Sequence, residues 1–291
     1  MLWKIKMVLK VLTIKFSQRF PKLMSDESYS KLLYFIVFGK RMDIKNPKTF
    51  NQHIIAEKLK DEKYGYDKYT DKYEVHNYVK ECVGEEVLNE VLGVYNSFDE
   101  IDFDKLPKSF ALKATHASGF NIIVTDKEKL DKADAKQKFD KWLKTNFYYK
   151  DREKNYKNIK PRILCDKYID FSDCLAEYKL YCFNGKVKLI CQNVNKDGKR
   201  YTNVLSEKFE KIPVKFGYPN IEYPLTEKKA ELVEIAEKLA KPFRFVRVDL
   251  YENNGKILFS ELTFHSGGGL VPFNPPEYDE KFGQFFEEEN V

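Results

Sequence analysis

Turn-forming residues at two places constrain the second half of this chain to antiparallel strands. The pair Asn184-Gly185 separates two apolar-rich runs, residues 177–183 and 186–192. Asn and Gly accept the positive φ angles of a tight turn at little cost, so the pattern predicts a β-hairpin. Residues 245–251 and 256–262 flank a second such turn and predict another hairpin. Because hairpins join antiparallel strands, we expect an α+β fold instead of a parallel βαβ series.

The loop of the second hairpin, Asn253-Asn254-Gly255, decides which side chains share a face. In a three-residue loop with the glycine in the left-handed conformation, Arg247 lies opposite Glu261. Arg247, Asp249 and Glu261 then project to one side of the sheet, whereas a two-residue loop puts Glu261 on the other side. Two carboxylates beside a guanidinium form either a solvated salt-bridge surface or a site that holds Mg²⁺ against nucleotide phosphates.

The strand that carries Glu261 continues into a glycine-rich loop. The sequence after Glu261 is Leu-Thr-Phe-His-Ser-Gly-Gly-Gly. Glycine has no side chain and lets another group approach the backbone closely. A glycine run alone most often marks a flexible turn, but its place directly after a candidate metal-binding strand favours a loop that faces a substrate. The candidate substrate residues are His265, Ser266, Gly267, Gly268 and Gly269.

An earlier pair of strands forms a candidate phosphate site. Residues 110–113 and 121–124 have the pattern of short strands, and the first ends at Lys113. Backbone amides of the small-residue loop between them would surround phosphate oxygens, and Lys113 would add a positive charge. The loop matches neither a P-loop nor a Rossmann fingerprint. His116 in this loop is a phosphate donor, a catalytic acid or an ordinary loop residue.

The remaining patterns are mostly helical. Thr49 and Gln52 have the spacing of a capping box and predict the start of a helix. Periodic apolar residues predict further helices over residues 71–82, 133–147 and 226–239. Five cysteines without a C-x-x-C pair favour reduced thiols in a cytosolic protein over a disulfide framework or a zinc site.

The N-terminal segment is basic. Residues 1–16 mix apolar residues with four lysines, and no apolar run has the length of a membrane span. The spacing predicts an amphipathic helix that either packs its apolar face on the core or lies on an anionic membrane surface. The whole chain has a net charge of +6, a mild excess that suits anionic small molecules and does not indicate nucleic acid.

The candidate elements follow one another in an order that resembles the ATP-grasp superfamily. Lys113 with its loop comes first, then a strand over residues 163–169, then residues 246–250 and 259–263. The chain most closely resembles the TupA-like branch, which is associated with teichuronopeptide and capsular polysaccharide synthesis. The similarity spans roughly residues 45–285, and its further matches are residues 46–50, 71–73, 92–95, 98–102, 178–185 and 272–279.

The resemblance implies an α+β, ATP-grasp fold in which two subdomains with antiparallel sheets grip ATP. A mostly helical N-terminal region is expected at residues 1–98, the core at 99–286 and a tail at 287–291. Within the core, the two subdomains would cover about residues 107–164 and 165–286.

The resemblance also implies a role for each matching residue. The implied ATP-binding residues are Lys113 at the phosphates, Ser118, Gly119 and Asn121 in a loop that closes over them, and Asp166, Lys167 and Ile169 beside the adenine. Asp249 and Glu261 match the Mg²⁺ carboxylates. The candidate catalytic residues are Arg247, which stabilises the anionic transition state, Lys179 as a further phosphate ligand, and His116. Asp166 stands where most members have Glu, and Thr263 where many have Asn.

The implied function is that of an ATP- and Mg²⁺-dependent ligase. Such enzymes convert a carboxylate into an acyl phosphate, which an amine then attacks to give an amide. The implied substrates are a uronic acid of a surface glycan or its nucleotide-sugar precursor, and an amino acid or amino alcohol. The implied location is the cytoplasm, with residues 1–16 as a peripheral contact to the inner face of the membrane. The alternatives are a kinase of the same fold, a glycosyltransferase of the same pathway, and a membrane-associated scaffold without nucleotide affinity.

Overall fold

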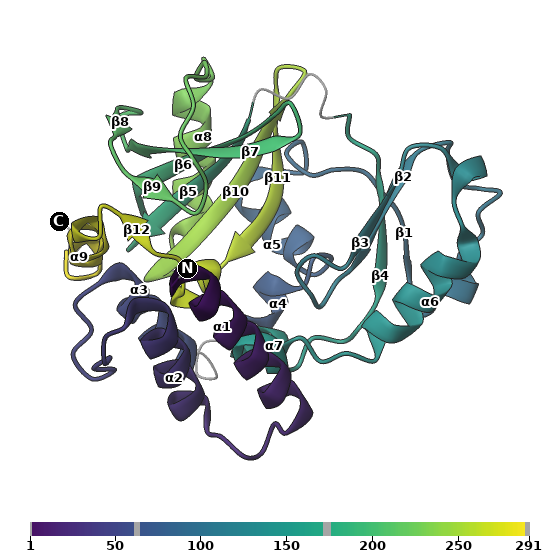
Figure 1. Ribbon diagram of the computed structural model, residues 1–291. Coiled ribbons are helices and arrows are strands. Elements are labelled where there is room, and N and C mark those ends of the chain that lie inside the picture. Colours follow the sequence, from purple (N-terminus) through teal and green to yellow (C-terminus); the bar gives the residue numbers. More distant parts are fainter. Residues whose placement is uncertain (1, 61–64, 171–175, 289–291) are drawn as a thin grey trace.

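Both Asn-Gly turns form the predicted hairpins. A computed structural model describes residues 2–60, 65–170 and 176–288 of the chain. Asn184 and Gly185 have φ angles of 48° and 78°, and Asn254 and Gly255 have φ angles of 49° and 71°. The hairpins belong to one six-stranded antiparallel sheet in the order β11-β10-β5-β6-β7-β8 (Figure 1). Its strands are β5 (Glu177–Phe183), β6 (Lys186–Lys196), β7 (Lys199–Ser206), β8 (Lys211–Ile212), β10 (Phe245–Asn253) and β11 (Lys256–Thr263).

A four-stranded antiparallel sheet forms the other half of the core (Figure 1). Its order is β1-β4-β2-β3, and the strands are β1 (Val91–Tyr95), β2 (Phe110–Ala114), β3 (Asn121–Val124) and β4 (Ile163–Lys167). Helix α6 (Lys132–Leu143) packs on this sheet through Ala135 and the fully buried Phe139. Strand β1 lies inside the segment 1–98, so this mostly helical region also contributes an edge strand to the sheet.

Apolar residues at every second position bury one face of the six-stranded sheet. Leu180 of β5 and Val248 of β10 are fully buried against α8 (Lys229–Ala240) and α5 (Val75–Val83). On the opposite face, Phe50 of α3 (Phe50–Lys60) lies within 6.5 Å of six aromatic rings at one end of the sheet. Burial of these apolar side chains is the main stabilising contribution to the fold. The middle of the second face is left for polar side chains.

The predicted capping box begins α3. The Gln52 backbone N–H donates to Thr49 Oγ1 at 3.3 Å, and the Lys48 N–H donates to Gln52 Oε1 at 2.8 Å. In a standard capping box the Gln52 side chain would accept a hydrogen bond from the backbone N–H of Thr49, whereas here it accepts one from the N–H of Lys48.

The helix predicted over residues 71–82 is divided. Helix α4 (Asp67–Thr70) ends before it, and α5 begins at Val75. The Asp71 carboxylate accepts the backbone N–H groups of Tyr73 and Glu74 at 2.8 and 3.1 Å. This side chain competes with helical hydrogen bonding and holds residues 71–74 in a turn, which explains the late start of α5.

Several elements differ from the sequence patterns or were missed. Helix α6 ends at Leu143 instead of residue 147, α8 begins at Lys229 instead of residue 226, and β7 and β8 were not predicted. No helix in the described parts of the chain is both long and apolar enough to cross a bilayer. The remaining elements are α1 (Leu2–Arg19), α2 (Asp26–Phe38), α7 (Tyr148–Asp151), α9 (Glu277–Gly283), β9 (Lys215–Phe216), β12 (Phe273–Asn274) and the short 3-10 helices η2 (Phe98–Glu100), η3 (Lys127–Lys129), η4 (Lys154–Tyr156), η5 (Ser266–Gly269) and η6 (Gln284–Phe286).

Candidate active site

The β10–β11 hairpin turns through two residues. Asn253 pairs with Lys256, which leaves Asn254 and Gly255 in the turn. The three-residue loop that would align Arg247 with Glu261 is therefore not formed. With regular pairing, a two-residue turn would direct Glu261 toward the α8 face of the sheet.

A β-bulge on β11 returns Glu261 to the predicted face. Asp249 pairs directly with Glu261, while the preceding residue of β11 to be paired is Phe259, so Ser260 is an extra residue. The extra residue reverses the alternation of side chains along β11. Phe259 and Leu262 are three positions apart and would lie on opposite faces of a regular strand, yet both lie in the core beside α8. Glu261 consequently projects with Asp249 from the opposite, open face.

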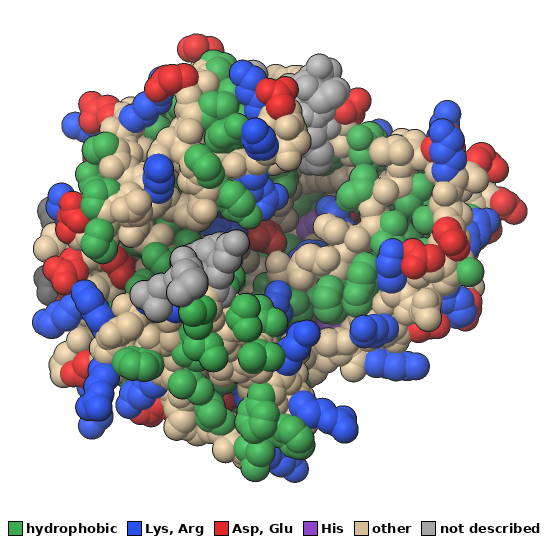
Figure 2. Space-filling model, viewed as in Figure 1, with side chains coloured by type: hydrophobic (Ala, Val, Ile, Leu, Met, Phe, Trp, Pro, Cys, Tyr) green, Lys and Arg blue, Asp and Glu red, His purple; other side chains and the backbone are tan. Residues whose placement is uncertain are grey.

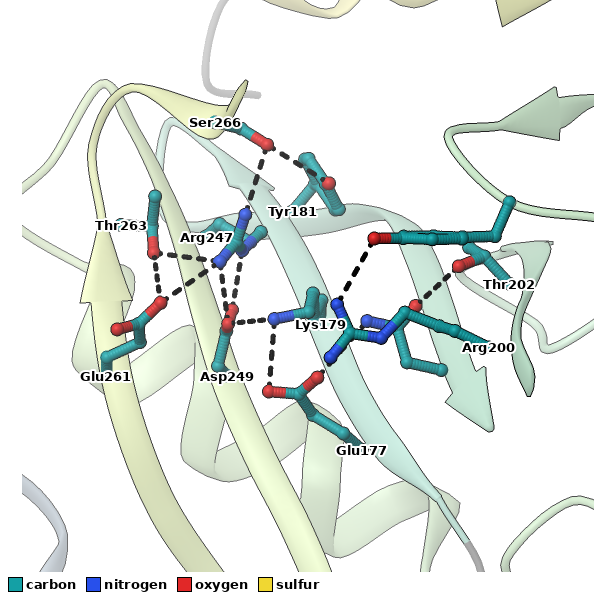
Figure 3. A network of polar contacts seen from close by, with 12 residues as sticks. Glu177, Lys179, Tyr181, Arg200, Thr202, Arg247, Asp249, Glu261, Thr263 and Ser266 are labelled. Carbon is teal, nitrogen blue, oxygen red and sulfur yellow. Dashed lines mark hydrogen bonds and ion pairs between the residues drawn. The ribbon is translucent and has the colours of Figure 1, made fainter. Parts of the chain in front are cut away.

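Five charged side chains from three adjacent strands form a cluster on this open face (Figure 3). The charged cluster comprises Glu177 and Lys179 of β5, Arg247 and Asp249 of β10, and Glu261 of β11. The Arg247 guanidinium donates to both Asp249 oxygens at 2.6 and 2.7 Å and lies 3.3 Å from Glu261 Oε1. Lys179 Nζ lies 2.6 Å from Asp249 Oδ2 and 3.0 Å from Glu177 Oε1. The Asp249 side chain is fully buried, whereas that of Glu261 is 34% exposed, so the cluster opens to solvent at Glu261.

The charges of the cluster stabilise one another. Burial by itself would raise the pKa of Asp249, but Arg247 and Lys179 outweigh burial and hold this pKa below its usual value. Burial and the neighbouring guanidinium oppose protonation of Lys179, yet Asp249 and Glu177 raise its pKa above the usual value. Asp249 is therefore ionised and Lys179 protonated at neutral pH.

Sequence reasoning missed Glu177 and Tyr181. Alternation along β5 puts both on the face of Lys179, and β5 lies beside β10, so Lys179 pairs with Asp249 and Tyr181 with Arg247. The Tyr181 hydroxyl lies 3.1 Å from Ser266 Oγ, which also accepts a hydrogen bond from Arg247 at 3.2 Å. The period-two pattern over residues 177–183 signals this face, but the pairing of β5 with β10 joins segments far apart in the sequence.

On the four-stranded sheet, Lys113 forms an ion pair with Asp166. Lys113 Nζ lies 2.8 Å from Asp166 Oδ2, and the Asp166 side chain is buried. The carboxylate expected beside the adenine thus contacts the lysine expected at the phosphates. Lys167 is exposed and lies 3.0 Å from Glu90, and Ile169 is half-buried just beyond the end of β4.

The loop after Lys113 divides into an anchored part and an exposed part. The His116 ring is buried, and its Nε2 lies 3.1 Å from the Trp142 carbonyl oxygen at the end of α6. Phe120 stacks on the Trp142 ring at a centroid distance of 5.1 Å. The predicted nucleotide residues Ser118, Gly119 and Asn121 are exposed. This placement favours His116 as an anchor of the loop over the catalytic role considered from the sequence.

Lys72 lies beside the loop that follows Lys113. Its backbone N–H donates to the Thr115 carbonyl at 3.2 Å. Burial lowers the pKa of the Lys72 ammonium, and neighbouring carboxylates, with Glu261 first among them, oppose this shift. Figure 2 shows a hollow between the two halves of the molecule, with charged side chains and a histidine inside it.

The glycine run after β11 lies largely against α3. Gly267, Gly268 and Gly269 all have positive φ, of 58°, 63° and 71°. A Cβ on Gly269 would lie 2.6 Å from Ile55 Cγ1, so the absent side chain is needed for packing on α3. The buried Lys58 Nζ donates to the Gly268 carbonyl at 3.3 Å. His265 is buried, and among the five candidate substrate residues only Gly267 is exposed.

Two facing antiparallel sheets with a lysine on one and opposed carboxylates on the other match the expected ATP-grasp architecture. All described strand pairs are antiparallel, which is not the parallel core of a nucleotide-sugar glycosyltransferase. The sequence model of the TupA-like ATPgrasp family matches residues 52–287. The chain belongs to this family.

Solved structures with a similar fold include three ligases. The D-Ala:D-Ser ligase VanG from Enterococcus faecalis is 14% identical, with a TM-score of 0.46 and coverage of 82% of this chain and 61% of that one. D-alanine–D-alanine ligase from Helicobacter pylori is 14% identical (TM-score 0.40; 76% and 61% covered). The Bacillus anthracis enzyme complexed with ATP is 18% identical (TM-score 0.39; 68% and 55% covered). The chain spans less than two thirds of the length of each of these proteins. No curated protein matches the sequence significantly.

The residues present fit Mg²⁺ and ATP. Asp249 and Glu261 offer hard oxygen donors on adjacent strands, and Thr263 Oγ1 lies 3.1 Å from Glu261 Oε1. The described residues contain no group of three His, Cys, Asp or Glu side chains that would enclose a metal. Two carboxylates suit Mg²⁺, which commonly takes its other ligands from nucleotide phosphates and water. Lys113 and Lys179 are the candidate sources of positive charge for those phosphates.

Proposed function

We propose that the chain is an ATP-dependent ligase that joins a carboxylate to an amine. The observation that carries the proposal is the direct pairing of Asp249 with Glu261 beside Arg247 and Lys179. This pairing brings two carboxylates suited to Mg²⁺ and two cations together on the open face of the six-stranded sheet. A site of this composition suits phosphoryl transfer, in which positioning and charge stabilisation supply most of the catalysis.

The reaction would proceed in two balanced steps. A substrate carboxylate oxygen attacks the γ-phosphorus of ATP, the bond to ADP breaks, and an acyl phosphate forms. The substrate amine then attacks the acyl carbon, inorganic phosphate leaves, and the amine loses a proton. Arg247 would stabilise the charge on the transferred group, while Lys113 and Lys179 would hold the phosphates. Mg²⁺ bound by Asp249 and Glu261 would neutralise phosphate charge.

The proposed substrates are a uronic acid of a surface glycan or its nucleotide-sugar precursor, and an amino acid or small amino alcohol. This part of the proposal is supported by the association of TupA-like proteins with teichuronopeptide and capsular polysaccharide synthesis. It places the protein in the cytoplasm, with residues 1–16 near the inner face of the membrane.

The test is an ADP-release screen in which uronic acids are crossed with amines and the amide is detected by mass. We expect ADP release to need both partners and to fall to background in the Glu261→Gln variant. The Asp197→Asn variant, which alters an exposed turn carboxylate, is the matched control and should keep the activity. If one sugar alone consumes ATP and yields a phosphorylated sugar, the chain is a kinase and the ligase proposal is wrong.

A further inference from the structure

Helix α1 presents its apolar side chains to solvent. Among the described residues, thirteen large hydrophobic side chains are exposed, and eleven of them lie between residues 5 and 35. On α1 they include Ile5, Val8, Leu12 and Phe16, whose exposed fractions are 48–58%. Their spacing of three or four residues places them on one stripe of the helix. Figure 2 shows hydrophobic side chains gathered over α1 and α2, with basic side chains around them.

The opposite side of α1 is polar and faces the protein. Lys6 Nζ donates to the Val37 carbonyl of α2 at 3.2 Å. Ser17 is buried, and its Oγ accepts a hydrogen bond from Arg152 at 2.7 Å. The helix is thus held to the molecule by polar side chains and by the half-buried Ile14, while the larger apolar stripe faces solvent. The simpler of the two sequence-based interpretations, in which the apolar face packs on the core, is wrong for this stripe.

The charge of the chain is concentrated in the same segment. Residues 1–24 contain six Lys and Arg residues and no Asp or Glu. The other 45 basic residues equal the 45 acidic ones, so this segment accounts for the whole net charge of +6. Lys15, Arg19 and Lys22 are exposed beside the apolar stripe.

We propose that the apolar stripe of α1, with Leu23 and with Leu32 and Phe35 of α2, docks on an anionic lipid bilayer. An exposed apolar stripe flanked by cations fits the boundary between acyl chains and anionic headgroups. A second copy of the chain is a poorer occupant, because it would bring the exposed cations Lys15, Arg19 and Lys22 close to their own copies. Since no described helix has the character of a span, α1 would lie along the surface. This inference does not rest on the proposed reaction.

The test is co-sedimentation of the full chain with lipid vesicles. We expect binding to vesicles that contain phosphatidylglycerol, weak binding to pure phosphatidylcholine, and weaker binding at high salt. The Val8→Ser/Leu12→Ser/Phe16→Ser variant should bind at least about tenfold less, because three exposed apolar side chains no longer enter the bilayer. The Lys15→Gln/Arg19→Gln/Lys22→Gln variant should lose the preference for the anionic lipid.

The matched control removes exposed apolar side chains elsewhere. Ile123 and Tyr218 are 52% and 44% exposed and lie outside the α1–α2 surface, so Ile123→Ser/Tyr218→Ser should bind vesicles like the unmodified chain. Equal binding to both lipid compositions, or undiminished binding by the α1 triple variant, would overturn the proposal. So would a lipid-free dimer, seen by sedimentation velocity, that the triple variant dissociates, because the surface would then join two copies.

Discussion

Asp249 and Glu261 lie directly opposite each other on β10 and β11 because Ser260 is bulged out of the strand pairing. A regular two-residue hairpin would put Glu261 with Phe259 on the apolar face beside α8. The extra residue Ser260 therefore moves Glu261 from the core-facing side of the sheet to the side of the candidate metal site.

Deletion of Ser260 should keep Glu261 on the open face. Without the extra residue, Phe259 would still pair with Leu250 and Glu261 with Asp249, so regular alternation alone puts Phe259 in the core and Glu261 beside Asp249. We expect ADP release to persist and the free energy of unfolding, measured by urea denaturation, to change by no more than about 1–2 kcal/mol. The Ser260→Ala variant keeps the extra residue and should also remain active. A folded deletion variant without activity would contradict this assignment of faces.

The carboxylates themselves can be neutralised without a change of shape. Asp249→Asn and Glu261→Gln should each lower Mg·ATP-dependent turnover by about 100-fold or more, because the developing charge loses its counterion. Glu261→Gln is the sharper test, since its side chain is partly exposed and the fold depends on it less. Circular dichroism checks the fold, and near-normal turnover in both variants would refute the metal assignment.

Lys113 should contribute to ATP affinity. Loss of one charge-assisted contact to a phosphate typically costs about 1.5–3 kcal/mol, so Lys113→Ala should weaken ATP binding by about tenfold or more in calorimetric titration. The Asp166 carboxylate would then be buried without its cation, and the Lys113→Ala/Asp166→Asn double variant removes this effect. Lys129→Ala, at a lysine whose side chain is 84% exposed, is the control and should bind ATP normally. Unchanged affinity in the double variant would exclude a phosphate role for Lys113.

Gly269 should be intolerant of a side chain. Its φ is 71°, and a Cβ would meet Ile55 Cγ1 at 2.6 Å and the Asn51 carbonyl oxygen at 2.7 Å. Gly269→Ala should lower the free energy of unfolding by about 2–5 kcal/mol, from backbone strain and overpacking together. Gly198 has a similar φ of 69° but open space around it, so Gly198→Ala should cost only about 1–2 kcal/mol. Equal costs in the two variants would contradict the packing explanation.

Stability should fall as the pH drops below neutrality. Burial lowers the pKa of all four histidines, that of His53 to about 4 and that of His265 to about 3, with His76 and His116 lowered as well. Below their usual pKa of 6.5 the unfolded chain binds protons that the folded chain excludes, so folding becomes less favourable as the pH falls. Each such histidine contributes a slope of up to about 1.4 kcal/mol per pH unit between pH 6 and 5. Urea denaturation at several pH values measures the slope, and His265→Gln should reduce it by one proton. A stability independent of pH over this range would contradict the prediction.

Much of the site was predictable from local patterns. Turn residues placed Arg247 and Asp249 on one hairpin, and alternation kept them on the same face. The predicted pairing of Arg247 with Glu261 was nevertheless not formed, because Thr263 takes that place. The bulge lets Phe259 before it and Leu262 after it both pack in the core beside α8 and α5. Because α8 and α5 are distant in the sequence, the residues of the hairpin alone do not indicate the bulge.

By itself, the amino-acid sequence determined the turns, the antiparallel hairpins, the order of the motifs and the basic N-terminal segment. Each of these depends on residues close together in the chain, through backbone preference, alternation or local charge. Only the tertiary structure decided the adjacency of β5 and β10, which adds Lys179 and Glu177 to the charged cluster, and the outward orientation of the α1 apolar stripe. Those arrangements depend on which distant surfaces bury each other, and the free energy of such burial is a property of the assembled fold.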